Sequence, residues 1–189
     1  MVAVMKRNIF FIFVAIAGLA ALSIAAAMSS TKAPVQARTV TSATPTKVAL
    51  TKPVEKFDGV KIQKSDAEWK RLLTPVQYYI LREKGTEAPY SSPLEKNHEH
   101  GTYYCAACGL ALFRSEAKFD SGTGWPSFYE PIFKGNVIED EDRSLDMVRT
   151  EVACARCRGH IGHVFDDGPQ PTGLRYCIDG AALRFERTK

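Results

Sequence analysis

Two matched pairs of cysteines constrain this chain more than any other feature of its sequence. Cys105 and Cys108 are separated by two residues, and Cys154 and Cys157 repeat that spacing. Each pair can offer two sulfur ligands from one tight turn, and four thiolates complete the tetrahedral coordination of a structural zinc ion. The alternative is two disulfide bonds, which an exported chain can form in an oxidising compartment. We expect zinc, one ion per chain, because structural disulfides have no need of two identical turns.

The two pairs leave Cys177 as the remaining one of five cysteines. In a strand over 174–178, a period of two places the apolar side chains on one face and leaves Arg175 beside Cys177 on the other. A neighbouring cation favours the thiolate, which is the reactive form of cysteine. We therefore expect Cys177 to be a reactive thiol rather than a buried, inert side chain.

Two histidines, His160 and His163, lie in a glycine-rich turn that enters a strand directly after the second cysteine pair. From their spacing alone, three roles are open to them. They can satisfy backbone groups, assist the thiol, or join Cys177 as ligands of a second, open zinc site. A zinc content of about two ions per chain is expected only of the last arrangement.

The N-terminal region has the composition of a targeting segment followed by a tether. Lys6 and Arg7 precede an uncharged apolar run over residues 9–28 that ends in small side chains. We expect residues 1–28 to be a signal peptide or, if they are not cleaved, a membrane anchor. Residues 29–57 are rich in Thr, Ala, Pro, Lys and Val without a sustained period, as in a flexible linker. The sequence thus predicts an exported protein, periplasmic or otherwise extracytoplasmic, that is secreted or tethered to a membrane by residues 9–28.

Residues 58–189 are expected to form one mainly β domain. Ser65 and Thr74 each begin a capping box for a short helix, and Gly85 suits the end of the second helix. Short apolar runs broken by turn residues follow, and the candidate strands are 102–105, 110–114, 147–152, 173–178 and 182–186. This part carries 18 basic and 20 acidic residues, so it offers no basic surface for a nucleic acid. Nothing in the pattern indicates an oligomer, and we expect a monomer.

Six blocks of this sequence together resemble the methionine-R-sulfoxide reductase B family. They are 85–87, 105–109, 118–128, 149–152, 162–169 and 171–178, in the family's order and spacing across about 65–187. The resemblance implies two small antiparallel sheets, short N-terminal helices and a zinc site remote from the chemistry. It also implies reduction of the R epimer of methionine sulfoxide in oxidised proteins or peptides, as repair of oxidative damage. A thioredoxin-like protein or a small thiol would be the reductant.

By the same resemblance, Cys177 is the nucleophile that attacks the sulfoxide sulfur and becomes a sulfenic acid. His160 and His163 would shape and protonate the active site, with His163 as the acid, and Arg175 would lie beside them. Trp125 would form the wall of the pocket for the substrate methyl group. The other substrate contacts that the resemblance implies are Phe128, Phe165 and Thr86.

The sequence departs from the family pattern at two positions. Thr123 stands where many members carry a second cysteine, so we expect an external thiol, rather than an internal disulfide, to reduce the sulfenic acid. Asp179 stands where the family usually has an amide. Its carboxylate either faces the thiol as part of the catalytic group and opposes thiolate formation, or forms a tight hairpin turn with Gly180.

A zinc-ribbon-like interaction module with a buried Cys177 is a hypothesis of a different class. It accounts for the two cysteine pairs, but it does not require the tryptophan and histidine blocks. A Cys177→Ser variant separates the two hypotheses, since only the enzyme needs that sulfur for turnover.

Overall fold

The computed structural model describes residues 55–188 of the 189-residue chain. The expected leader over 1–28 and nearly all of the expected linker over 29–57 lie outside the described residues. Within 55–188, no helix has both the length and the apolar character needed to cross a bilayer.

Two short helices begin the domain, as the capping boxes predict. They are α1 (Asp66–Leu72) and α2 (Pro75–Glu83), and in each the N-cap hydroxyl and the third helical side chain exchange hydrogen bonds with the backbone. The end of α2 differs from the expectation, because Lys84 rather than Gly85 takes the left-handed conformation, with φ of 56°. Gly85 is needed for another reason: a Cβ there would overlap the ring of Tyr79.

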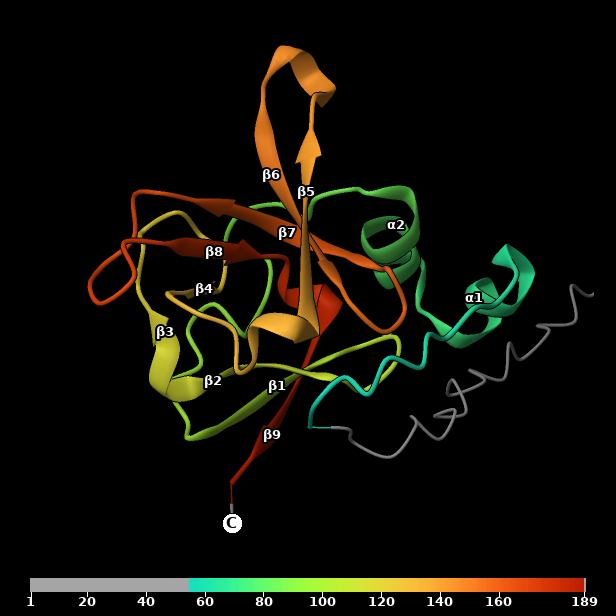
Figure 1. The fold of residues 1–189 in the computed structure, drawn as a ribbon, viewed down its shortest axis with the longest axis horizontal. Helices are drawn as coiled ribbons and strands as arrows, with labels where there is room; N and C mark the ends of the chain where they lie inside the picture. Colours follow the sequence, from blue (N-terminus) through green and yellow to red (C-terminus); the bar gives the residue numbers. More distant parts are fainter. Residues whose placement is uncertain (1–54, 189) are drawn as a thin grey trace, which may run out of the picture. The chain divides into compact units, whose positions relative to one another are not determined.

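Besides four short 3₁₀ turns, the remaining elements of the described part are nine short strands in two antiparallel sheets, which confirms the predicted fold class. The strands are β1 (Gly101–Cys105), β2 (Ala111–Arg114), β3 (Lys118–Phe119), β4 (Ser127–Phe128), β5 (Val137–Asp142), β6 (Arg149–Cys154), β7 (His160–Phe165), β8 (Arg175–Ile178) and β9 (Leu183–Arg187). One sheet has the order β2-β1-β9, and the other has the order β3-β4-β8-β7-β6-β5. In the view of Figure 1 the smaller sheet lies below the larger one, and the β5–β6 hairpin extends beyond the neighbouring strands.

The core lies between the sheets and is rich in aromatic rings. Phe128 is fully buried there, stacked on Phe113 at 4.4 Å between ring centroids and edge-on to Tyr103 at 5.0 Å. This corrects the expectation that Phe128 contacts substrate. Successive side chains of a strand point to opposite faces, so Ser127, which pairs with Cys177, leaves Phe128 facing the core.

The contacts of the domain begin slightly before residue 58. Asn136 is fully buried, and its side-chain amide donates to the carbonyl oxygens of Glu55 and Ala111 at 2.8 and 2.7 Å. Its Oδ1 accepts from the backbone N–H of Phe57 at 3.0 Å. Residues 55–57 are therefore fixed to the folded part by one asparagine.

Candidate active site and metal centre

The four paired cysteines come together in the core. Cys105 and Cys108 lie at the β1–β2 turn, and Cys154 and Cys157 lie at the β6–β7 turn. All four sulfurs lie within 4.8 Å of one another, with 3.7 Å between the Sγ atoms of Cys105 and Cys157 and 3.5 Å between those of Cys108 and Cys154. Four Zn–S bonds of about 2.3 Å in a tetrahedron separate the sulfurs by about 3.8 Å. The cluster therefore fits a zinc ion, whereas a disulfide needs a separation of about 2.05 Å.

The cavity beside Cys177 is a separate feature, and no cysteine of the cluster lines it. It has a volume of about 130 Å³ and is lined by Thr86, Trp125, Arg149, Gly162, His163, Phe165, Cys177 and Asp179. It thus unites six of the side chains that the sequence singled out. His160 lines an adjoining hollow of about 480 Å³, which shares Thr86, Arg149 and His163 with the cavity.

Strand β8 presents Cys177 as the period of two predicts. Tyr176 and Ile178 are buried in the core, and Arg175 shares the face of Cys177. The guanidinium of Arg175 makes a two-point ion pair with Asp167, at 2.8 and 2.7 Å, and lies 4.4 Å from the centroid of the Phe165 ring. Arg175 does not line the cavity itself, and it fixes Phe165, which does.

Both histidines face the same side of β7 because the strand is irregular at Gly162. In a regular strand, side chains three residues apart point to opposite faces. Here the pairing with β6 shifts between Gly162 and His160, so the imidazole rings of His160 and His163 lie edge to face, 5.2 Å apart. Gly162 has φ of 150°, and a Cβ there would overlap the carbonyl oxygen of Cys177. Only glycine permits this approach of β7 to β8.

The two imidazoles are held by different carboxylates. His160 is buried, and its Nδ1 lies 2.8 Å from Oε1 of Glu151. The other oxygen of that carboxylate, Oε2, accepts from Nζ of Lys84. Burial lowers the pKa of His160 despite the nearby carboxylate, so this ring is neutral at neutral pH. His163, the Cα partner of Cys177 in the β7–β8 pairing, has its Nε2 2.8 Å from Oδ2 of Asp142.

Within residues 55–188, the four-cysteine cluster is the one group of three or more His, Cys, Asp or Glu side chains arranged to hold a metal ion. The rival arrangement, in which His160, His163 and Cys177 bind a second zinc ion, is therefore not found in the described part of the chain.

The environment of Cys177 differs from the sequence expectation. Burial raises the pKa of the Cys177 thiol, and this effect outweighs Thr123 and Arg175, which both lower it. The Thr123 hydroxyl lies 3.8 Å from Sγ, and the charge of Asp179 raises the pKa further. A cation on the same face of the strand does not by itself produce a thiolate here, because the sulfur is largely removed from water.

Asp179 is a buried member of the cavity and does not form a hairpin. Strands β8 and β9 belong to different sheets, so the chain leaves β8 through a short 3₁₀ turn, η4 (Gly180–Ala182). Oδ1 of Asp179 accepts the backbone N–H of Glu87 at 2.8 Å, and Oδ2 lies 4.0 Å from Nε2 of His160. Burial raises the pKa of Asp179 to about 7. The neutral carboxyl group can donate a hydrogen bond, which recovers part of what an amide offers.

Sequence reasoning missed four side chains that position this site. Glu87 accepts the N–H groups of Gly180 and Ala181 at 2.6 and 3.0 Å, and its carbonyl accepts from the indole of Trp125 at 3.1 Å. The other three are Asp142, Arg149 and Glu151. Glu87, Arg149 and Glu151 belong to recognised sequence blocks without an assigned role, whereas nothing in the sequence marked Asp142.

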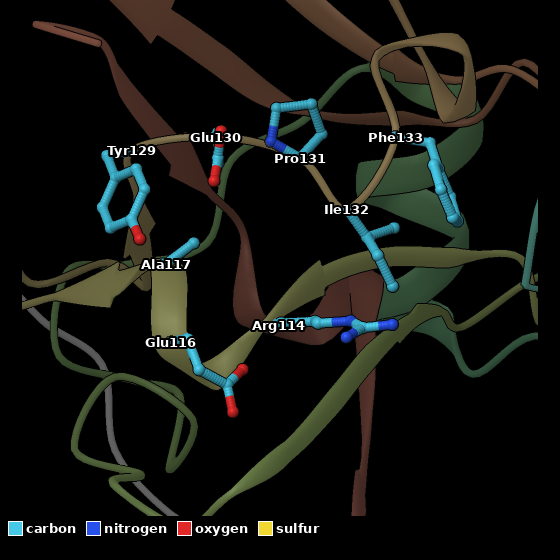
Figure 2. A pocket seen from close by; sticks show the side chains of 8 residues that line it. All are labelled: Arg114, Glu116, Ala117, Tyr129, Glu130, Pro131, Ile132 and Phe133. Carbon is cyan, nitrogen blue, oxygen red and sulfur yellow. The ribbon is translucent and has the colours of Figure 1, made fainter. Parts of the chain in front are cut away.

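Another hollow lies away from this chemistry. Its volume is about 330 Å³. The side chains that line it, shown in Figure 2, are Arg114, Glu116, Ala117, Tyr129, Glu130, Pro131, Ile132 and Phe133. It shares no residue with the cavity of Cys177 or with the cysteine cluster. It is therefore not part of the candidate active site.

Comparison with known proteins identifies the family to which this sequence is similar. A family model described as the SelR domain matches residues 73–187. The relatives named Peptide methionine sulfoxide reductase MsrB include one from Leptospira interrogans, 56% identical over 127 residues that cover 67% of this chain and 97% of the relative. Another, from Bradyrhizobium diazoefficiens, is 59% identical over 126 residues that cover 67% of this chain and 91% of the relative. 

Among solved structures, the "Yippee-like" domain of Mis18 is similar with a TM-score of 0.40 and 20% identity, over 48% of this chain and 99% of that one. That likeness is too slight to bear on the fold. The family model covers more than half of the chain, and the relatives are matched over nearly their whole length. The chain therefore belongs to the SelR-domain family, the family of the MsrB peptide methionine sulfoxide reductases.

Proposed function

We propose that this chain reduces the R epimer of methionine sulfoxide, chiefly in oxidised proteins, back to methionine and uses Cys177 as its nucleophile. The observation that carries the proposal is the cavity in which Cys177, His163 and Trp125 meet. A sulfur outside the cysteine cluster, an imidazole and an indole ring line one small space, and this supports a reaction on a small group there. The relatives' shared name, which specifies methionine sulfoxide reduction, supports the same activity.

In the proposed reaction the sulfur of Cys177, as thiolate, attacks the sulfoxide sulfur, and His163 protonates the oxygen. The attack forms a bond between the two sulfurs; that bond and the sulfur–oxygen bond of the substrate then break as the protonated oxygen passes to Cys177, which leaves methionine and a sulfenic acid, so the substrate sulfur is reduced and the cysteine sulfur oxidised. Neutral His160 and the carboxyl group of Asp179 bound the polar side of the site.

The choice of epimer follows from two unlike walls. The rings of Trp125 and Phe165 offer apolar contact for the methyl group, and Thr86 lies at the junction with the adjoining hollow. Arg175 keeps Phe165 in place. A sulfoxide of opposite hand would direct its oxygen at the rings and leave it without a hydrogen-bond donor, which costs about 1–3 kcal/mol.

We also propose that the cysteine cluster holds one structural zinc ion, bound by Cys105, Cys108, Cys154 and Cys157. The ion would supply folding free energy and would take no part in the reaction. Since four of the five sulfurs are then committed, the sulfenic acid has no internal partner, and an external thiol, thioredoxin-like or small, would restore Cys177.

We also propose that the protein is exported, with residues 1–28 as a signal peptide or as an anchor through residues 9–28. We propose further that it is a monomer. Methionine repair in a periplasmic or similar extracytoplasmic space is consistent with a leader of this composition.

Turnover of each sulfoxide epimer with dithiothreitol tests the proposed activity. We expect the wild-type protein to convert the R epimer, the Cys177→Ser variant to be inactive, and the S epimer to react about 5- to 150-fold more slowly than the R epimer. Mass spectrometry after one turnover without reductant should find one added oxygen on Cys177. Full activity in Cys177→Ser, or equal use of both epimers, would contradict the proposal.

A further inference from the structure

The last residue of β5, Asp142, brings a carboxylate to the active site from the outermost strand of the larger sheet. Its Oδ2 lies 2.8 Å from Nε2 of His163 and accepts from Nη2 of Arg149 at 2.7 Å. Its Oδ1 accepts from the backbone N–H of Ser144 at 2.9 Å, and Ser144 Oγ accepts from the same guanidinium at 3.2 Å. The carboxylate is thus held on both oxygens, and all its partners are hydrogen-bond donors.

Asp142 stays ionised in this setting. The N–H of Ser144, and after it the imidazole of His163, hold the pKa of this carboxyl group well below its usual range. An ionised carboxylate only accepts hydrogen bonds, so the nitrogen that faces it must carry a proton. His163 therefore has its proton on Nε2, and Nδ1 is the ring nitrogen left for a molecule in the cavity.

The imidazole of His160 is held through the other ring nitrogen. Glu151 lies against Nδ1 of His160, whereas Asp142 lies against Nε2 of His163. Two carboxylates from neighbouring strands thus select opposite tautomers for two histidines on one strand. A ring anchored by a carboxylate keeps its orientation and is stabilised when it becomes an imidazolium.

We propose that Asp142 is a positioning residue that holds His163 with its proton on Nε2 and stabilises the imidazolium that protonates the sulfoxide oxygen from Nδ1. The inference rests on the proposed function, because it assigns Asp142 a part in that reaction. The charged and titratable groups that line the cavity or the adjoining hollow with His163 come from five elements. They are Tyr79, Glu83 and Lys84 from α2 and its end, Asp142 from β5, Arg149 and Glu151 from β6, His160 from β7, and Cys177 and Asp179 from β8 and its end. Among these, Asp142 makes the direct hydrogen bond to the ring.

The first test is the tautomer of His163 in the reduced wild-type protein, read from the imidazole nitrogen shifts in a ¹⁵N NMR spectrum. We expect the Nε2–H form, and a shift of the population toward Nδ1–H in Asp142→Asn, whose amide can turn either way. A wild-type ring protonated on Nδ1 alone would overturn the proposal. This readout needs no turnover, so it stands apart from the proposed activity.

The second test is the pH dependence of kcat and KM between about pH 6 and pH 9. We expect Asp142→Asn to lower kcat about tenfold or more, since general acid catalysis is worth at least that much, with KM nearly unchanged. The loss should grow toward alkaline pH, because an uncharged amide stabilises the imidazolium less. Asp142→Glu, which restores the charge on a longer side chain, should recover part of kcat.

Glu141→Gln is the matched control, since it removes an exposed carboxylate one residue away that pairs with Arg143 rather than with the site. It should keep the wild-type profile. An unchanged profile in folded Asp142→Asn would refute the role of Asp142. A wild-type protein that reduces neither epimer would instead refute the proposed function and leave the tautomer result intact.

Discussion

The reactivity of Cys177 depends on neighbours that act on its sulfur in opposite directions. Burial raises the pKa of the thiol, while the hydroxyl of Thr123 and the guanidinium of Arg175 lower it. Thr123 is itself held by Ser121, whose hydroxyl lies 2.8 Å from those of both Thr123 and Ser127. A chain of hydroxyl groups therefore lies next to the sulfur of Cys177.

Removing this hydroxyl should make the thiol less reactive. In Thr123→Val the thiolate loses a hydrogen-bond donor, so the pKa of Cys177 should rise further. A hydrogen bond worth about 0.5–1.5 kcal/mol corresponds to alkylation by iodoacetamide that is about two- to tenfold slower at neutral pH. Thr123→Ser, which keeps the hydroxyl, should react nearly as the wild type does. Equal rates in the valine variant would show that Thr123 does not act on the sulfur.

The buried carboxyl group of Asp179 should make stability depend on pH. Its pKa of about 7 in the folded protein exceeds the value of about 3.9 for an unfolded chain. The folded state therefore binds this proton more tightly, and the stability that it contributes is full below about pH 4 and is lost as the pH rises through about 7. We expect Asp179→Asn to have a higher Tm than the wild type at pH values above about 7, and nearly the same Tm near pH 4. The same substitution at exposed Asp166 should show no such trend, and a parallel course of the two Tm curves for Asp179→Asn would refute the expectation.

At the scale of elements, the irregular strand β7 is what brings two imidazoles to one face of the sheet. The shift in its pairing with β6 depends on Gly162, whose Cα lies against the carbonyl of Cys177 on β8. The position of the two histidines and the position of Cys177 therefore both depend on this glycine.

Gly162→Ala should therefore damage both stability and activity. The added methyl group meets backbone rather than a movable side chain, so β7 and β8 must separate, at a cost of about 1–3 kcal/mol or more in the free energy of unfolding. Gly135→Ala is the matched control, because a Cβ there meets nothing within 4 Å, and it should change stability by less than about 0.5 kcal/mol. Urea unfolding of both variants compares them directly. A Gly162→Ala protein as stable and active as the control would contradict this interpretation of the strand.

How well each element could be predicted depends on whether its signal is local. The N-terminal caps of the two helices and the alternation of β8 depend on signals within a few residues, and both were confirmed. Strand β5 could not be found in this way, because four of its six residues are acidic and it has no apolar alternation. Most of the residues that line the cavity were predicted from the sequence blocks that carry the family resemblance. Phe128 was wrongly included, because the face of a two-residue strand cannot be read from its period. Asp142 and His163 are 21 residues apart in the sequence, and only the folded sheet brings their side chains together.

At the scale of the whole molecule, the cysteine cluster connects the two sheets. One pair belongs to the β1–β2 turn of the smaller sheet, and the other belongs to the β6–β7 turn of the larger one. A metal ion bound by both pairs crosslinks segments that are far apart in the sequence, and its binding free energy then becomes folding free energy.

Loss of this metal should destabilise the fold without any change at Cys177. We expect about one equivalent of zinc in the purified protein, and in Cys105→Ser less metal and a markedly lower Tm. Cys177→Ser should keep both its zinc and its Tm, since that sulfur is not part of the cluster. Metal analysis with thermal unfolding decides the matter. A Cys105→Ser protein that unfolds like the wild type would leave the cluster without a structural role.

All five cysteines lie in the part of the chain that the structure describes, and the cavity around Cys177 includes none of the other four. In the proposed cycle, the damaged protein and the molecule that restores the enzyme must then react with the same sulfur, one after the other. An excess of either molecule at the sulfur would delay the reaction of the other. The rate of repair would depend on the balance between the two and would not simply increase with the amount of damage.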